Sequence, residues 1–109
     1  MKTFVLMSRH CPSGPSMVEV VSNVKAGPKS RKQWLEAAAK HCPGVKFLAH
    51  YAVFGSWDFM DIYEAPDEEQ AAKVSLICSS MTDFQVESWT AIPEDRLEAL
   101  AAELQEAMD

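Results

Sequence analysis

The alternation of hydrophobic and polar residues along the chain predicts four β-strands. Thr3–Met7 is a short apolar run with Phe and Val, which is typical of a strand. Val45–Phe54, Trp57–Glu64 and Phe84–Ile92 have the same character and predict three more strands. Only Gly55-Ser56 separates the second strand from the third. We therefore expect a type II′ hairpin turn there, because Gly tolerates the positive φ of the first turn position.

The segments between these strands have the spacing of amphipathic helices. Met17–Val24 fits a helical pattern, and Pro28 suits the first turn of a second helix that ends before the "CPG" stretch. Asp67 is expected to cap the helix after the third strand, with Gln70 three residues later as in a capping box. Pro93 begins a last helix. The apolar stripes of the last two helices are Ala71, Val74, Cys78 and Met81, and Leu97, Leu100, Ala101 and Leu104.

The predicted order is β–α–β–β–α–β with an extra C-terminal helix, in one domain over residues 1–109. This order is the split βαβ, ferredoxin-like arrangement of the α+β class, in which helices cover one face of the sheet. The strands nevertheless carry large residues on both faces, so a second cover is needed. We expect a homodimer, packed sheet to sheet or closed into a shared α/β barrel. The expected faces are Phe47, Tyr51 and Met60 on one side, and Leu48, Phe54, Trp57, Phe59 and Tyr63 on the other.

Composition and charge narrow the classes of partner. The formal net charge of −6 argues against nucleic acid and anionic membranes, since both attract basic surfaces. No run approaches the roughly 20 apolar residues of a membrane span, and no targeting segment is visible, so we expect a cytoplasmic protein. The three cysteines lack CxxC spacing, which predicts reduced thiols. The basic stretch Lys25–Lys32 is interpreted as a solvated helix start.

Several stretches together resemble the GYD domain family. "GSWD" at residues 55–58 matches the Gly, Tyr, Asp pattern of the family's hairpin, with Trp57 in the place of the usual Tyr. "EAPD" at residues 64–67 resembles the family's common helix start, while "SNVKAGPKSR" and "VESWTAI" are weaker matches. The "HCPSGPS" segment is longer than the usual loop. The resemblance spans roughly residues 3–92 and implies a ferredoxin-like protomer of the dimeric α/β-barrel superfamily. That superfamily includes monooxygenases, haem-degrading enzymes, isomerases and ligand-sensing modules, and the fold does not choose among them.

Asp58 is the first residue with candidate chemistry. Its carboxylate is placed to act as a base or to anchor a ligand at the mouth of a cleft. The structural alternative is that an Asp beside a tight turn accepts backbone hydrogen bonds and fixes the turn. The structural alternative is favoured.

His50 and Asp61 form a second candidate. The hairpin register sets Ala52 opposite Phe59 and therefore His50 opposite Asp61, with Cβ atoms about 5 Å apart. A carboxylate that holds a His in one tautomer makes it a useful general base. The alternatives are an interface pair that fixes the dimer register and a solvent-exposed pair at the sheet edge.

The tripeptide His-Cys-Pro occurs twice, at residues 10–12 and 41–43. Four His and Cys ligands would suit zinc, but in this fold the two loops lie at opposite ends of strands about 17–20 Å long. We therefore expect no metal site within one chain, and a site shared across a dimer interface is the less favoured alternative. Cys11 is a weaker candidate for a reactive thiol, and Cys78 is expected in the core. Residues 68–80 contain no His that could ligate haem, and no cofactor is expected.

These patterns favour a small homodimer that binds a small, partly apolar molecule between sheet and helices. The ligand contacts are expected from Trp57, Phe59, Tyr63 and His10. One alternative is a cofactor-independent monooxygenase or isomerase that uses His50 with Asp61, or Asp58. The other is a non-catalytic assembly or regulatory module that binds a partner protein. The patterns do not decide whether the protein is an enzyme.

Overall fold

The computed structural model describes residues 1–10 and 31–109, which form an α+β fold around a four-stranded antiparallel sheet. The strand order is β2-β3-β1-β4, consistent with a ferredoxin-like fold. The strands are β1 (Lys2–His10), β2 (Lys46–Ala52), β3 (Phe59–Ala65) and β4 (Phe84–Ala91). The helices are a segment over residues 31–41, α2 (Glu68–Met81) and α3 (Glu94–Met108). The four predicted strands are thereby confirmed, whereas the helix predicted over Met17–Val24 lies outside the described residues.

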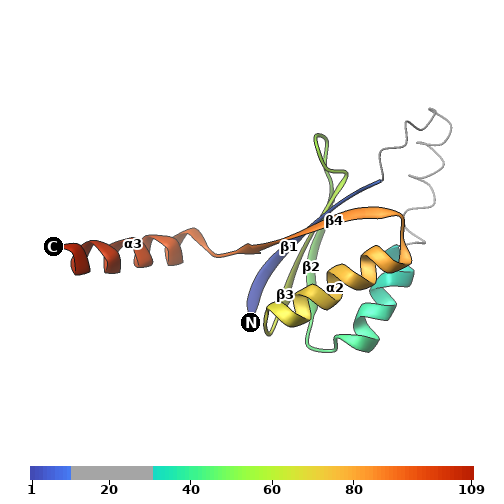
Figure 1. Ribbon diagram of the computed structural model, residues 1–109, viewed down its shortest axis with the longest axis horizontal. Coiled ribbons are helices and arrows are strands. Elements are labelled where there is room, and N and C mark those ends of the chain that lie inside the picture. The colour runs from blue at the N-terminus through green and yellow to red at the C-terminus, as the bar shows by residue number, and fades with distance from the viewer. Residues whose placement is uncertain (11–30) are drawn as a thin grey trace.

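Two helices cover the same face of the sheet (Figure 1). The predicted cap of α2 is confirmed, because the backbone N–H of Gln70 donates to Asp67 Oδ1 over 2.9 Å. The helix over residues 31–41 packs Trp34 edge-on against Phe47 of β2, with ring centroids 5.6 Å apart. The core between helices and sheet consists of Phe4, Leu6, Trp34, Cys42, Tyr63, Ala65, Ala71, Val74 and Cys78. Within the described ranges, no helix combines the length and apolar character needed to cross a membrane.

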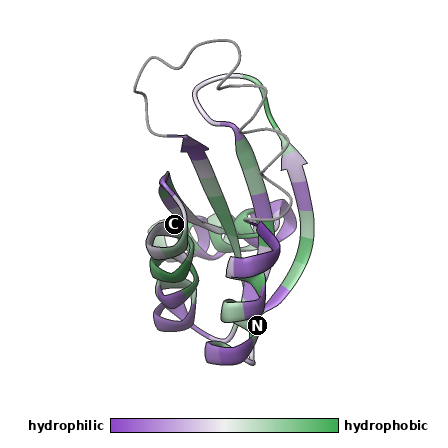
Figure 2. Cartoon of the chain, turned by 90° about the vertical axis from the view of Figure 1, so that its right-hand side faces the viewer, coloured by the Kyte–Doolittle hydropathy of each residue, from purple (hydrophilic) through white to green (hydrophobic). Residues whose placement is uncertain are grey.

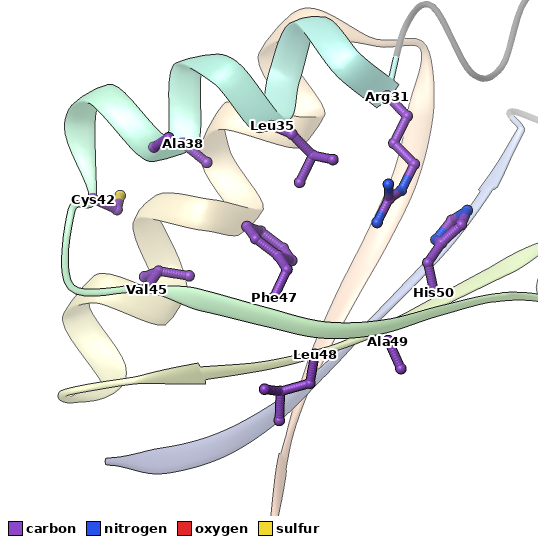
Figure 3. A pocket seen from close by; sticks show the side chains of 10 residues that line it. Arg31, Leu35, Ala38, Cys42, Val45, Phe47, Leu48, Ala49 and His50 are labelled. Atoms are coloured by element: carbon purple, nitrogen blue, oxygen red, sulfur yellow. The ribbon is translucent and has the colours of Figure 1, made fainter.

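A β-bulge in β2 changes which residues face the helices. Phe47 pairs with Tyr63, but Ala49 pairs with Ile62, so Leu48 is an extra residue in β2. The expected placement of Phe47 and Leu48 is therefore wrong. Phe47 lies on the helix face, where its ring packs 5.5 Å from that of Tyr63, and Leu48 points to the opposite face (Figure 3). Period-2 counting fails here because the bulge shifts the alternation by one residue.

The prediction of a two-residue turn between β2 and β3 is wrong, because the loop of this hairpin is wider. The strands stop at Ala52 and resume at Phe59, and the closing hydrogen bond runs from Val53 N–H to the Asp58 carbonyl over 2.9 Å. Contacts with β1 explain the difference. The Asp58 N–H donates to the Ser8 carbonyl at 2.9 Å, and these bonds hold Asp58 against β1 and away from a tight turn.

The second face of the sheet lacks a helix in the described part of the chain (Figure 1). The register places Val5, Met60, Ile62 and Trp89 on this face, together with Tyr51 and Leu48. The last three remain substantially exposed, at 43%, 53% and 47% of their surface respectively. Hydrophobic and hydrophilic residues alternate as bands along the strands (Figure 2). Both faces of the sheet therefore carry apolar side chains, as the sequence predicts.

Candidate functional site

A pocket of about 450 Å³ lies between the helix over residues 31–41 and the edge strand β2 (Figure 3). Its volume is within the range of small-molecule sites, about 300–1,000 Å³. Leu48 and Ala49 line it from the helix-free side of β2, so the pocket reaches around the strand at the sheet edge. The lining residues are Arg31, Leu35, Ala38, Ala39, Cys42, Val45, Phe47, Leu48, Ala49 and His50.

The polar end of the pocket is built around a buried carboxylate. Asp61 is only 1% exposed. Its Oδ1 accepts a hydrogen bond from Arg31 Nη2 at 2.8 Å and a second from His50 Nδ1 at 2.9 Å. A buried carboxylate is costly unless it is paired and hydrogen-bonded, so this arrangement accounts for the presence of Asp61 in the interior. Arg31 and His50 are held at one end of the pocket as a consequence (Figure 3).

The register of β2 and β3 places His50 opposite Asp61, as the sequence predicts. An ionised carboxylate only accepts hydrogen bonds, so Nδ1 of His50 carries the hydrogen and donates a hydrogen bond to Asp61. Nε2 is then left to accept or donate a proton elsewhere. The Phe59 ring stacks on the imidazole, with centroids 5.6 Å apart and planes inclined by 18°. His50 is thus fixed in position on one side by a carboxylate and on its face by an aromatic ring.

The other end of the pocket is apolar. Ala38, Cys42 and Val45 line it, and Phe47 forms the wall next to the polar end (Figure 3). Cys42 is completely buried and Trp34 packs behind Phe47, so this wall is continuous with the core. The pocket is therefore amphipathic. It offers hydrocarbon contacts along its length and a guanidinium with an imidazole at one end.

Asp58 lies away from this pocket and has a structural partner. Its Oδ2 accepts the backbone N–H of His10 at 2.9 Å, and its own backbone bonds fix the hairpin loop to β1. This geometry agrees with the structural interpretation of Asp58. Trp57 in the same loop lies beneath the Arg9 guanidinium, 4.7 Å from the ring centroid, which is a cation–π contact.

His10 and Phe59 belong to an aromatic group beside the site. The His10 ring lies edge-on between Phe84, at 4.7 Å, and Phe59, at 6.2 Å. Both ring nitrogens of His10 are buried and have no hydrogen-bond partner among the described residues, although Nδ1 lies 4.0 Å from an Asp83 carboxylate oxygen. Phe59 connects this group to His50 through its stacked ring. The structure thus brings Phe59 to the site, with His10 one ring further away.

Tyr63 is a core residue and does not line the pocket. It is completely buried, and its hydroxyl donates to the Ala71 carbonyl at 3.4 Å and shares a hydrogen bond with Ser88 Oγ at 3.1 Å. Burial raises the pKa of Tyr63 above its ordinary 10.0, and the nearby Asp61 charge adds to the increase, against the hydrogen bond from Ser88. The phenol therefore stays neutral over the physiological pH range.

The cysteines of the described chain are core thiols. Cys42 and Cys78 are both free and buried. Burial raises the pKa of Cys78 to about 12, so its unreactive thiol form persists. This placement confirms Cys78 as a core residue, while Cys11 and Pro12 lie outside the described residues. No group of three or more His, Cys, Asp or Glu side chains able to hold a metal ion occurs in residues 1–10 and 31–109.

Arg31 is the site residue that the sequence pattern did not single out. The interpretation of Lys25–Lys32 as a solvated helix start is wrong for Arg31, which reaches the buried Asp61, 30 positions further along the chain. The sequence feature that could have pointed to Arg31 is Asp61, an acidic residue at a position expected to be buried. An Asp on the helix face of a central strand requires a cationic partner, and a basic residue early in the covering helix is the nearest source.

Comparison with known proteins gives one match. The family model of the GYD domain matches residues 5–101. No curated protein and no solved structure matches the chain.

Proposed function

The chain belongs to the GYD domain family, and from this premise we propose that it binds a small, partly apolar molecule with an acidic group in the pocket beside β2. The observation that carries the proposal is the amphipathic lining of that pocket. Apolar side chains form most of the wall, and Arg31 and His50 lie together at one end (Figure 3). The hydrocarbon part of the ligand would occupy the apolar end, and its acidic group would lie at the polar end and accept hydrogen bonds from the Arg31 guanidinium.

We propose an acidic group on the ligand because Arg31 keeps N–H donors that do not bond to Asp61. Asp61 takes one Nη2 bond from Arg31 and one Nδ1 bond from His50. A guanidinium has five N–H donors in a planar fork that matches a carboxylate, and Arg31 Nε is buried without a hydrogen-bond partner among the described residues. A ligand carboxylate would accept from the unused donors. Charge-assisted hydrogen bonds of this type contribute about 1.5–3 kcal/mol.

We also propose that the protein is a homodimer formed through the helix-free face of the sheet. Three large apolar side chains are exposed there: Leu48 and Tyr51 on the edge strand β2, and Trp89 on the opposite edge strand β4. Apolar patches of this kind mark interaction surfaces in soluble proteins. A second copy would cover the patch with an equivalent one, as in an isologous two-fold interface. Light scattering tests this directly, and a monomer at micromolar concentration would refute it.

Calorimetry with a matched ligand pair tests the binding proposal. Decanoate and decanamide share the alkyl chain and differ in charge. We expect decanoate to bind more tightly than decanamide, and Arg31→Gln to weaken decanoate binding by about 10- to 100-fold, the equivalent of one charge-assisted hydrogen bond. Lys73→Gln, which removes the same charge from an exposed position of α2 that does not line the pocket, is the control and should bind as the native protein does. Equal affinity for the two ligands, or binding of neither, would contradict the proposal.

The His50–Asp61 pair favours a second function at the same site, namely cofactor-independent acid–base catalysis in a monooxygenase or isomerase. A histidine held at 2.9 Å by a buried carboxylate on the wall of a pocket has the geometry of a general base. Phenylpyruvate in D₂O is a suitable probe, since it combines a carboxylate with exchangeable C–H bonds next to a carbonyl. NMR should show loss of the CH₂ signal faster than in buffer alone, and His50→Gln should abolish the acceleration. No acceleration by the native protein would exclude this function for such acids.

A further inference from the structure

The C-terminal helix α3 makes no packing contact that buries any of its residues. Figure 1 shows that it continues from β4 away from the sheet and its covering helices. Leu97, Leu104 and Met108 are 55%, 64% and 85% exposed. With Leu100 and Ala101 they form one apolar stripe, because their positions repeat every three or four residues. The stripe is therefore an apolar face without a partner among the described residues of its own protomer.

An isolated helix of this size is not expected to be stable in water. α3 has 15 residues, which is near the length below which single helices are marginal, and most helical stability in proteins comes from packing of the apolar face. The described shape agrees with a missing partner, since the radius of gyration is 16.9 Å, against about 13 Å for a packed domain of this length. Some other surface must receive the stripe.

We propose that α3 of each protomer packs on a second copy of the chain, along β2 and the helix over residues 31–41, and closes the pocket there. The inference rests on the proposed function of that pocket and extends it, since it makes the site a product of both protomers. Strand order explains why the protomer's own α3 is not the cover. β4, which leads into α3, and β2, which borders the pocket, are at opposite edges of the sheet.

Charge supports the second copy as the occupant. α3 carries Glu94, Asp95, Glu98, Glu103 and Glu106 against the single Arg96, so it is strongly acidic. The exposed surface beside the pocket is basic, because Lys32 and Lys40 lie on the helix against the single Glu36, while Arg31 is paired with Asp61 and Lys46 lies opposite Glu64. The two surfaces are thus complementary in sign, and the pocket wall offers apolar contacts for the leucine stripe. A pocket that is open at the sheet edge in one protomer would be enclosed in the pair.

Photo-cross-linking with isotope-mixed protein tests this placement. The photoreactive residue p-benzoylphenylalanine is introduced at Leu104 in ¹⁵N-labelled full-length protein, which is mixed with unlabelled native protein. After irradiation we expect peptides that join labelled α3 to unlabelled residues 31–48. The same residue at Ala102, on the other side of the helix, is the control and should give several-fold fewer such products. Products only within one labelled chain, or only between two α3 helices, would overturn the inference.

A second variant separates this inference from the binding proposal. Leu104→Asp places a charge in the stripe and leaves the buried core intact, so near-UV circular dichroism should be unchanged and far-UV circular dichroism should lose at most the signal of α3. We expect decanoate affinity to fall at least fivefold, while decanoate remains preferred over decanamide because Arg31 is untouched. Unchanged affinity would refute the closure of the pocket by α3 and leave the binding proposal standing. If decanoate does not bind the native protein, the binding proposal fails, while the cross-links still report where α3 lies.

Discussion

Replacement of Asp61 by Asn tests whether the buried carboxylate organises the site. The substitution keeps the volume of the side chain and one oxygen acceptor, but it removes the negative charge that Arg31 and His50 share. We expect Asp61→Asn to lower the free energy of unfolding and to release the Arg31 side chain from its position beside His50. The residue is 1% exposed, so water does not replace the lost charge at Oδ1.

The expected magnitude follows from the two hydrogen bonds. The bond from His50 changes from a charge-assisted bond, worth about 1.5–3 kcal/mol, to a neutral bond of about 0.5–1.5 kcal/mol, and the bond from the Arg31 guanidinium loses the charge of its acceptor, which we take to cost a similar amount. The loss is therefore about 1 kcal/mol per bond and about 2 kcal/mol in total. The Arg31 and His50 side chains are 28% and 32% exposed, so partial hydration of both keeps the loss below the about 3–5 kcal/mol of a fully buried broken pair. A change of this size lowers the melting temperature by roughly 10 °C in a domain of this length.

Urea unfolding monitored by tryptophan fluorescence gives the measurement. Both proteins are compared at the same protomer concentration, because the stability of the proposed dimer would depend on concentration. Glu69→Gln is the matched control, since it removes the same charge from an exposed position of α2, and it should change the unfolding free energy by less than about 0.5 kcal/mol. If Asp61→Asn is as stable as the native protein within that limit, the carboxylate does not organise the site and the reasoning fails.

Three further predictions concern the thiols, the bulge and the hairpin loop. Cys78 has its pKa raised from 9.0 to about 12, so above pH 9 the unfolded chain ionises first. The contribution of Cys78 to stability should therefore be constant below pH 9 and be lost as the pH rises from 9 to 12; a midpoint of urea unfolding that is unchanged between pH 9 and pH 11 would contradict this. Deletion of Leu48 removes the extra residue of β2 and leaves Phe47 and His50 on the helix face, so His50 should still pair with Asp61; loss of the Nδ1 hydrogen bond in ¹⁵N NMR spectra would show otherwise. Gly55 has a φ of +158°, where a side chain is strained, and Gly55→Ala should cost about 1 kcal/mol in thermal unfolding without affecting decanoate binding, whereas a neutral substitution would mean that the loop relaxes freely.

The pairing of His50 with Asp61 was predictable from sequence even though the turn was not. The predicted tight turn pairs Phe54 with Trp57, whereas the observed loop first pairs Val53 with Asp58. The loop is wider by one residue on each strand, so every later pair keeps its partner. The register of two strands in a hairpin depends on where the centre of the hairpin lies. Here the local sequence Gly55-Ser56 marks that centre. Local hydrophobic periodicity likewise determined the four strands and the capped start of α2.

Only the tertiary structure decided the composition of the pocket. Arg31 reaches Asp61 because the helix crosses the sheet above it, and nothing in the local pattern around Arg31 reports that crossing. Phe47 faces the helices because β2 gains an extra residue against β3, and a bulge is a property of two paired strands rather than of one. Periodicity describes which residues share a face within one element. The contacts that make a site join elements far apart in the chain, so their packing together selects the residues that meet.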